Sequence, residues 1–222
     1  MKNIDIEKLK TILPKYPGIL GKNEYFNSAV LIPIVFLNGE NHFLFEKRSE
    51  NIKQGGEICF PGGEFDFSVD NNFEDTAIRE TEEEIGISRD KIDVLGKLDT
   101  LIGPRELTVD SVVARLKIAS LTECFIDKKE VDKVFTVPIS FFTDTPPEIF
   151  TVISEQNHKF FNSDGTEENL IPSNKKSLNE HIDKSYRKSK RTVLVYKTNG
   201  EVIWGITARL VNEIVNKIKS ME

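Results

Sequence analysis

The chain has 222 residues, of which 38% are hydrophobic and 30% charged, and its formal net charge is -6. The negative charge disfavours a nucleic acid as the main partner, because binding to a phosphate backbone requires a basic surface. The two cysteines, Cys59 and Cys124, have no metal-ligand spacing. No basic-then-apolar leader begins the sequence and no apolar run reaches the length of a membrane helix, so we expect a cytoplasmic protein.

The first part of the chain predicts one short helix followed by strands. The helix, over residues 4–13, has its apolar side chains on one side. Strands are then expected over residues 29–37, 42–47 and 57–60. The first of these is apolar almost throughout, which indicates burial on both faces, although Pro33 favours a bulge or an edge position.

The rest of the chain mixes helices and strands without a repeat or a linker. Helices are predicted over residues 74–86, 139–142 and 205–218. Strands are predicted over residues 92–102, 107–118, 131–137, 148–154, 192–196 and 202–203. The polar stretch 158–189 has no clear periodicity and is interpreted as an irregular insertion, with a mobile lid as one hypothesis.

The helix over residues 74–86 carries the pattern with the most chemical meaning. At the helical repeat, Glu80, Glu83 and Glu84 share one face, while Ile78 and Ile85 lie opposite. Crowded carboxylates repel one another unless a positive charge holds them, and cations of the Mg²⁺ type take such oxygen ligands together with phosphate oxygens. A solvated helix face is the alternative. The pattern, which follows a tight turn predicted over residues 60–63, favours a metal-assisted phosphate-chemistry site.

The end of this helix resembles the second half of the Nudix box, G-x5-E-x7-R-E-U-x-E-E-x-G-U, in which U is bulky and apolar. Six residues match it by position: Arg79, Glu80, Glu83, Glu84, Gly86 and Ile87. Thr81 occupies the first apolar position.

The first half of the box is irregular. Asn71 and Phe65 stand where the upstream Glu and Gly are expected, so the glycines at 62–63 imply a short insertion. Three acidic residues are candidates for the role of the upstream Glu: Asp66, Asp70 and Glu74.

Three further segments resemble the coenzyme A pyrophosphatase-like branch of the Nudix superfamily. Residues 44–63 resemble its upstream signature, L-L-T-x-R-S-x3-R-x3-G-x3-F-P-G-G, with Arg48 matching and Lys53 at the second Arg position. Residues 130–138 and 203–210 resemble two later segments of the same branch.

The resemblance implies an α/β (α+β) Nudix fold, in which a mixed β-sheet is sandwiched between helices. A single Nudix hydrolase domain is expected over residues 1–222, with its core over about 27–219. Residues 1–26 would form an N-terminal helical extension, and residues 158–189 a polar insertion.

The resemblance also implies a Nudix pyrophosphohydrolase. The expected reaction is metal-dependent cleavage of the pyrophosphate bond of coenzyme A or its derivatives, giving 3′,5′-ADP and 4′-phosphopantetheine. Mg²⁺ or Mn²⁺ would be held by Glu80, Glu83 and Glu84, with Glu83 or Glu80 as the base and Arg79 orienting a ligand glutamate. The alternatives are a Nudix pyrophosphatase for ADP-ribose, NADH or other nucleoside diphosphate derivatives, and an inactive nucleotide-binding module.

Four further residues are expected to contact the substrate. Arg48 is a candidate for binding phosphate, because a guanidinium binds phosphate oxygens bidentately, with a structural salt bridge as the alternative; Lys53 is a weaker candidate. Gly62 and Gly63 would let the backbone approach the metal or phosphate, which a Cβ would block. The expected partner is a small coenzyme A-like nucleotide, with neither nucleic acid nor membrane; a homodimer is left open.

Overall fold

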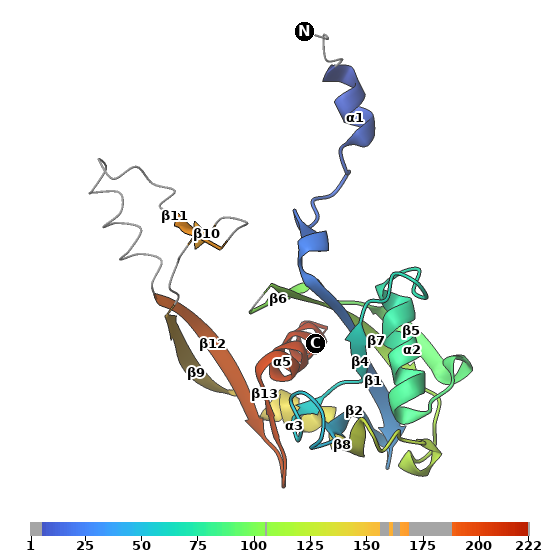
Figure 1. Ribbon diagram of the computed structural model, residues 1–222. Helices are drawn as coiled ribbons and strands as arrows, with labels where there is room; N and C mark the ends of the chain where they lie inside the picture. Colours follow the sequence, from blue (N-terminus) through green and yellow to red (C-terminus); the bar gives the residue numbers. More distant parts are fainter. Residues whose placement is uncertain (1–5, 105, 156–159, 162–164, 169–187, 222) are drawn as a thin grey trace.

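The computed structural model describes residues 6–104, 106–155, 160–161, 165–168 and 188–221. Its centre is a mixed sheet of eight strands (Figure 1). These strands are β1 (Phe26–Leu37), β2 (Glu40–Arg48), β3 (Ile58–Cys59), β4 (Gly62–Glu64), β5 (Ile92–Lys97), β6 (Leu101–Gly103), β7 (Leu107–Leu116) and β8 (Val131–Pro138). The order is β3-β2-β1-β7-β5, with β4 beside β1, β6 beside β7 and β8 beside β2.

Helices cover both faces of this sheet, as the sequence predicted. The covering helices are α2 (Phe73–Ile85), α3 (Ile139–Asp144) and α5 (Gly205–Lys219), and a further short helix, α1 (Leu9–Ile12), precedes the sheet. Short 3-10 turns occur at Ile6–Lys8, Lys22–Glu24, Arg89–Lys91 and Leu121–Glu123. In Figure 1, α2 lies on one side of the sheet, and α3 and α5 lie on the other. Within the described ranges, no helix combines the length and apolarity needed to cross a membrane.

Two smaller sheets complete the described structure. One has the order β13-β12-β9, formed by β9 (Glu148–Glu155), β12 (Lys188–Lys197) and β13 (Val202–Trp204). The other pairs β10 (Phe160–Phe161) with β11 (Glu167–Glu168). These short strands show that the part of stretch 158–189 that is described is not wholly irregular; the lid hypothesis falls mainly on residues outside the described ranges.

Strand β1 is the centre of the large sheet, and the edge or bulge expected at Pro33 is wrong. β1 runs parallel to β7 on one side, with Pro33 opposite Ala114. On its other side it pairs antiparallel with β4 through Ser28–Val30 and with β2 through Ile34–Leu37. Pro33 falls between these two paired stretches, so its missing N–H leaves neither ladder incomplete.

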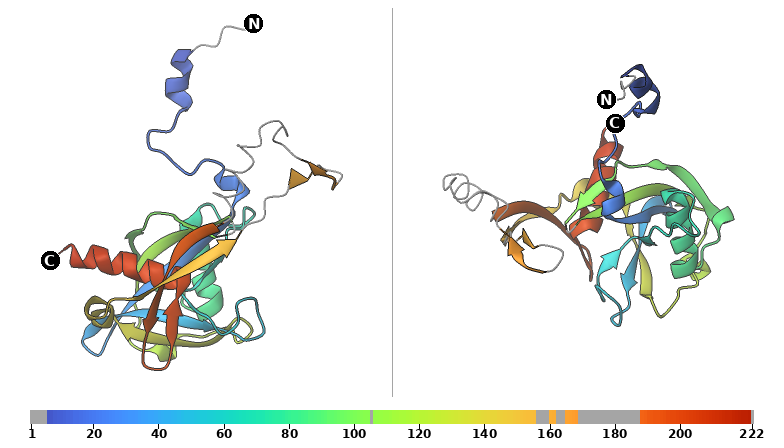
Figure 2. Two further views of the ribbon diagram at one scale, coloured as in Figure 1. Left: turned by 90° about the vertical axis from the view of Figure 1, so that its left-hand side faces the viewer. Right: turned by 45° about the horizontal axis from the view of Figure 1, so that its top comes forward.

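Three other elements differ from their predictions. The strand expected over 92–102 is divided into β5 and β6, and a register shift interrupts β5 between Val94 and Gly96. The glycines predicted as a turn form β4, because the chain bends at Pro61 and then pairs with β1. The N-terminal helix is short, and its apolar Ile12 is 72% exposed. Figure 2 shows α1 standing clear of the sheet.

The alternation of side chains along β2 assigns its residues to two separate cores. Phe43 and Phe45 belong to the cluster on the side of α5, where they pack with Phe60 and Phe142. Leu44 belongs to the opposite cluster, which contains residues of α2. Successive strand residues point to opposite faces, so even-numbered positions of β2 near Leu44 face α2.

Helix α2 is closed at both ends by local signals. The side chain of Asn72 accepts hydrogen bonds from the backbone N–H groups of Glu74 at 2.9 Å and Asp75 at 3.2 Å. At the other end Gly86 has φ 68°, a left-handed conformation that favours glycine. The predicted glycine cap is therefore confirmed.

The Asn72 cap predicts a measurable loss of stability on its removal. Asn72→Ala leaves the first N–H groups of α2 without their acceptor and should lower the free energy of unfolding by about 1 kcal/mol. Urea denaturation would measure it. Asn72→Asp retains the acceptor and serves as the control; equal losses in the two variants would contradict the capping role.

Candidate functional site

The three glutamates of α2 lie in different environments, so the single shared face predicted from the helical repeat is only partly correct. Glu84 is 2% exposed and lies on the buried side of the helix. The side chain of Glu80 is 16% exposed, whereas that of Glu83 is 59% exposed. Ile78 and Ile85 are buried as expected. The three carboxylates therefore differ in depth: Glu83 lies at the surface, Glu80 is partly buried, and Glu84 is buried between α2 and the sheet.

Glycines in β4 make this contact possible. The N–H of Gly62 donates a hydrogen bond of 2.9 Å to the Glu84 carboxylate. A Cβ on Gly63 would lie 2.4 Å from the Cδ of Glu80, and one on Gly62 would lie 2.3 Å from the carbonyl oxygen of Ala29. The close backbone approach predicted for these glycines is thus present, and the groups that approach are α2 carboxylates and β1.

Arg79 joins four acidic or carbonyl groups around the outer part of α2. Its Nη1 contacts Glu80 at 2.7 Å and Glu83 at 3.1 Å. Its Nε and Nη2 each bind the Asp70 carboxylate at 3.0 Å, and Nη2 also donates to the carbonyl of Glu64 at 3.4 Å. The arginine therefore holds two of the three predicted glutamates in place.

Among the three candidates for the upstream Glu, Asp70 is the residue that binds Arg79. Asp70 is buried and also accepts hydrogen bonds from the Thr76 hydroxyl at 2.9 Å and the Asp66 N–H at 3.0 Å. The hydrogen bonds from Arg79 are the main cause that lowers the pKa of Asp70 to about 2. The Asp66 side chain instead accepts from Ser68.

The remaining candidate, Glu74, points elsewhere. It pairs with Lys97 at 3.1 Å and so does not reach the arginine. The loop between β4 and α2 thus supplies a shorter acidic side chain from a different position, with the same bidentate contact to a guanidinium that an upstream glutamate would offer.

Glu46 is a site residue that the sequence analysis missed. It follows Leu44 by two positions in β2, faces α2 and is 0% exposed. The Sγ of Cys59, its cross-strand neighbour in β3, donates to Glu46 Oε1 at 3.1 Å. Glu46 Oε2 has no hydrogen-bond partner among the described residues. The available signal was a carboxylate that directly follows the apolar run of residues 43–45, two positions after Leu44.

Burial destabilises the ionised form of these carboxylates. Loss of hydration is the main cause that raises the pKa values of Glu46, Glu80 and Glu84. Charge repulsion from Glu46 and Glu80 further raises the pKa of Glu84, and repulsion from Glu130 and Glu80 further raises that of Glu46. Burial likewise raises the pKa of the Cys59 thiol, which stays protonated and able to donate. The group therefore favours an added positive charge.

The donor chemistry of this group fits a divalent cation. Carboxylate oxygens are the ligands preferred by Mg²⁺ and Mn²⁺, and the free Oε2 of Glu46 adds an unused one. No three acidic, His or Cys side chains of the described residues are already arranged around one cation position. The reason is visible in the contacts: Arg79 binds Glu80 and Glu83, and Gly62 binds Glu84.

The two predicted phosphate-binding cations lie beside this group. Arg48, at the end of β2, donates through Nε to the carbonyl of Lys53 at 3.3 Å. Its charge lowers the pKa values of Glu46 and Glu84. Lys53 itself is exposed. Arg48 is thus close enough to act on the carboxylates, while Lys53 lies further out.

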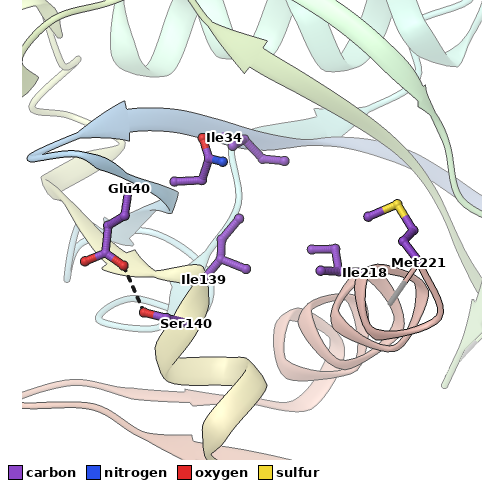
Figure 3. Close-up of a pocket in the computed structure, with 7 residues that line it drawn as sticks. Ile34, Glu40, Ile139, Ser140, Ile218 and Met221 are labelled. Carbon is purple, nitrogen blue, oxygen red and sulfur yellow. Dashed lines mark hydrogen bonds between the residues drawn. The ribbon is translucent and has the colours of Figure 1, made fainter.

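A cavity of about 410 Å³ lies elsewhere (Figure 3). It is lined by Ile34, Glu40, Asn41, Ile139, Ser140, Ile218 and Met221. These residues come from the ends of β1 and β2, from α3 and from the end of α5, so the cavity lies on the side of the sheet opposite α2. It is mostly apolar and does not contain the carboxylate group.

Comparison with known proteins agrees with this site. The NUDIX domain family model matches residues 27–155. Nudix hydrolase 3 of Caenorhabditis elegans is 35% identical over 130 residues, covering 56% of this chain and 53% of that protein. The Mus musculus peroxisomal coenzyme A diphosphatase NUDT7 is 34% identical over 115 residues, covering 51% of this chain and 48% of that protein.

A third relative is the mitochondrial coenzyme A diphosphatase NUDT8 of Homo sapiens, 30% identical over 134 residues, covering 60% of this chain and 56% of that protein. The chain spans about half the length of the curated relatives it matches. The predicted resemblance to the coenzyme A pyrophosphatase-like branch is confirmed by these matches. Because the family model covers more than half of the chain, from β1 to β9, this protein belongs to the Nudix family.

Proposed function

We propose that the protein is a pyrophosphohydrolase that cleaves the diphosphate linkage of coenzyme A or a derivative, giving 3′,5′-ADP and 4′-phosphopantetheine. The observation that carries this proposal is the group of α2 carboxylates held by Arg79 and by the β4 backbone. The similarity to two relatives named as coenzyme A diphosphatases supports the choice of substrate. We take the chain to act as one Nudix domain.

We assign Glu80, Glu83 and Glu84 as the residues that would hold Mg²⁺ or Mn²⁺. When bound, such a cation supplies positive charge that neutralises the diphosphate and stabilises the leaving oxygen. The carboxylates themselves must be ionised to bind it. Before a cation binds, Arg79 supports the ionised state by pairing with Glu80 and Glu83.

Glu83 is the best placed of the three to accept a proton from the attacking water. Its side chain is 59% exposed, so water reaches it, and Arg79 fixes its position at 3.1 Å. The water oxygen forms a new bond to phosphorus as its proton passes to the Glu83 carboxylate, and the bond between phosphorus and the bridging oxygen breaks. Glu80, at 2.7 Å from the same guanidinium, is the alternative base.

Arg48 is proposed to bind a phosphate oxygen of the substrate. Its Nε is used by the Lys53 carbonyl, and its terminal nitrogens make no hydrogen bond within the described part of the chain. A guanidinium with two free nitrogens suits a phosphate group. Lys53, which is exposed nearby, would add charge at the rim.

A product assay tests the substrate. With Mg²⁺ or Mn²⁺ present, the purified protein should convert coenzyme A to 3′,5′-ADP and 4′-phosphopantetheine, resolved by chromatography. AMP from ADP-ribose or NADH with coenzyme A untouched would instead assign the protein to dinucleotide hydrolysis. No product from any of the three, with nucleotide still bound, would indicate a binding module.

Single substitutions test the carboxylates. Glu83→Gln and Glu84→Gln should each reduce the rate by about 100-fold or more, since each removes a charged oxygen ligand. Glu82→Gln is the matched control on the same helix: Glu82 is exposed, accepts only from the Arg89 N–H at 2.7 Å and should leave the rate unchanged. Normal turnover by a folded Glu84→Gln protein would exclude this scheme.

The Asp70–Arg79 contact gives a pH-dependent prediction. The pKa of Asp70 is lowered to about 2 in the folded protein. Its ionised form therefore stabilises the fold fully above the pKa of the unfolded chain, and this stabilisation is lost as the pH falls toward 2. Asp70→Asn should therefore cost roughly 2 kcal/mol at pH 7 and about half of that at pH 3. Urea denaturation at both pH values measures this difference. A loss of equal size at both would show that the charge is not what matters.

A further inference from the structure

Two buried carboxylates of the site have no ion-pair partner among the described residues. Arg79 binds Glu80 and Glu83, which lie toward the solvent. The Glu84 carboxylate accepts only the Gly62 N–H, and the Glu46 carboxylate only the Cys59 thiol, among the described residues. Glu46 and Glu84 come from different elements, β2 and α2, and Glu46 is close enough to raise the pKa of Glu84 through charge repulsion.

Glu46 is the more exceptional of the two. It is completely buried, its Oε1 is used by Cys59, and its Oε2 has no partner. A buried polar atom without a partner costs free energy, and a buried carboxylate costs more than a neutral group. The preceding residue on the same face of β2, Leu44, is apolar and packed. An apolar or smaller polar residue would therefore fill this position at lower cost, and the branch signature has Thr here.

The direction in which Glu46 points indicates what its free oxygen binds. The alternation of β2 directs it to the α2 side, where the charge of Glu80 acts on Glu46 and the charge of Glu46 acts on Glu84. Cys59 donates to Oε1 only and so orients the carboxylate with Oε2 left available. A small, positively charged group would both bind Oε2 and offset the charge of the neighbouring carboxylates. A divalent cation meets both conditions.

We propose that Glu46 is an additional ligand of the divalent cation, contributed by the sheet and facing Glu84 of α2. The cation would then be clamped between β2 and α2 instead of resting on α2 alone. This inference rests on the proposed function only in that both use the α2 carboxylates. It adds a residue outside the Nudix box and gives Cys59 a role in orienting it.

Mn²⁺ binding tests this proposal without reference to turnover. Isothermal titration of the chelator-treated protein with Mn²⁺ should show an affinity roughly 10- to 100-fold weaker in Glu46→Gln and Glu46→Thr than in the wild type. Glu40→Gln is the matched control, since Glu40 lies on the same strand, carries the same charge and accepts a hydrogen bond of 2.9 Å from the Ser140 hydroxyl of α3, away from the α2 carboxylates. Its Mn²⁺ affinity should equal that of the wild type.

Thermal unfolding separates this role from a structural one. Without Mn²⁺, Glu46→Gln should unfold at the same temperature as the wild type or a higher one, because an unpartnered buried carboxylate is removed. With Mn²⁺, the wild type should gain more in unfolding temperature than the variant. A variant that unfolds at a lower temperature without Mn²⁺ and binds Mn²⁺ normally would show that Glu46 only supports the fold.

The outcomes also separate this proposal from the substrate assignment. A wild-type protein that binds Mn²⁺ tightly through Glu46 and leaves coenzyme A intact would overturn the proposed substrate and retain the role of Glu46. Equal Mn²⁺ affinity in the wild type and folded Glu46→Gln would overturn the role of Glu46, whatever the substrate. A wild type that binds no Mn²⁺ would overturn both the cation site and this ligand.

Discussion

The close approach of α2 to β4 is the constraint on which the rest of the site depends. A hydrogen bond from the Gly62 N–H to the Glu84 carboxylate joins the helix to the sheet, beside Gly63, whose missing Cβ leaves room for the Glu80 carboxylate. This contact buries a carboxylate that would otherwise be solvated, and Glu80 of the same helix is close enough for its charge to act on Glu46 of β2. A Cβ at position 62 would clash with the backbone of β1, and one at position 63 would displace the Glu80 carboxylate.

The charges around this contact are arranged in two layers. On the outside, Arg79 neutralises two glutamates and is itself held by the buried Asp70, so this layer is stable without any bound ion. On the inside, Glu46 and Glu84 are buried without an ion-pair partner among the described residues. A protein that retains such unfavourable charge gives up some stability for the ability to bind, which is a known cost of functional sites. The outer layer keeps α2 in position, while the carboxylates of the inner layer stay available to a cation.

The sequence predicted the mixed sheet, its covering helices and the Arg79–Glu84 motif, because these depend on local periodicity and on spacing within one helix. It left Asp70 among three candidates, since the path of a loop decides which side chain reaches an arginine nine positions away. It missed Glu46 because that role arises only when β3 and α2 pack beside β2. The sequence predicted a turn where β4 forms. The pairing of β4 with β1 is a tertiary contact, and it overrides the local preference of two glycines for a turn.

The parallel pairing of β1 with β7 has a consequence for how the molecule is made. These neighbours are separated by about 80 positions along the chain, for example Ser28 and Val109, and α2 lies in the connection between them. Closing so long a loop costs entropy before any pairing energy is gained, so this step is slow relative to hairpin formation. During synthesis, β1 and β2 form their hairpin early, but β1 lacks its central neighbour until β7 has emerged. Its apolar edge is exposed for that interval, and the nascent chain is then most open to association with other chains.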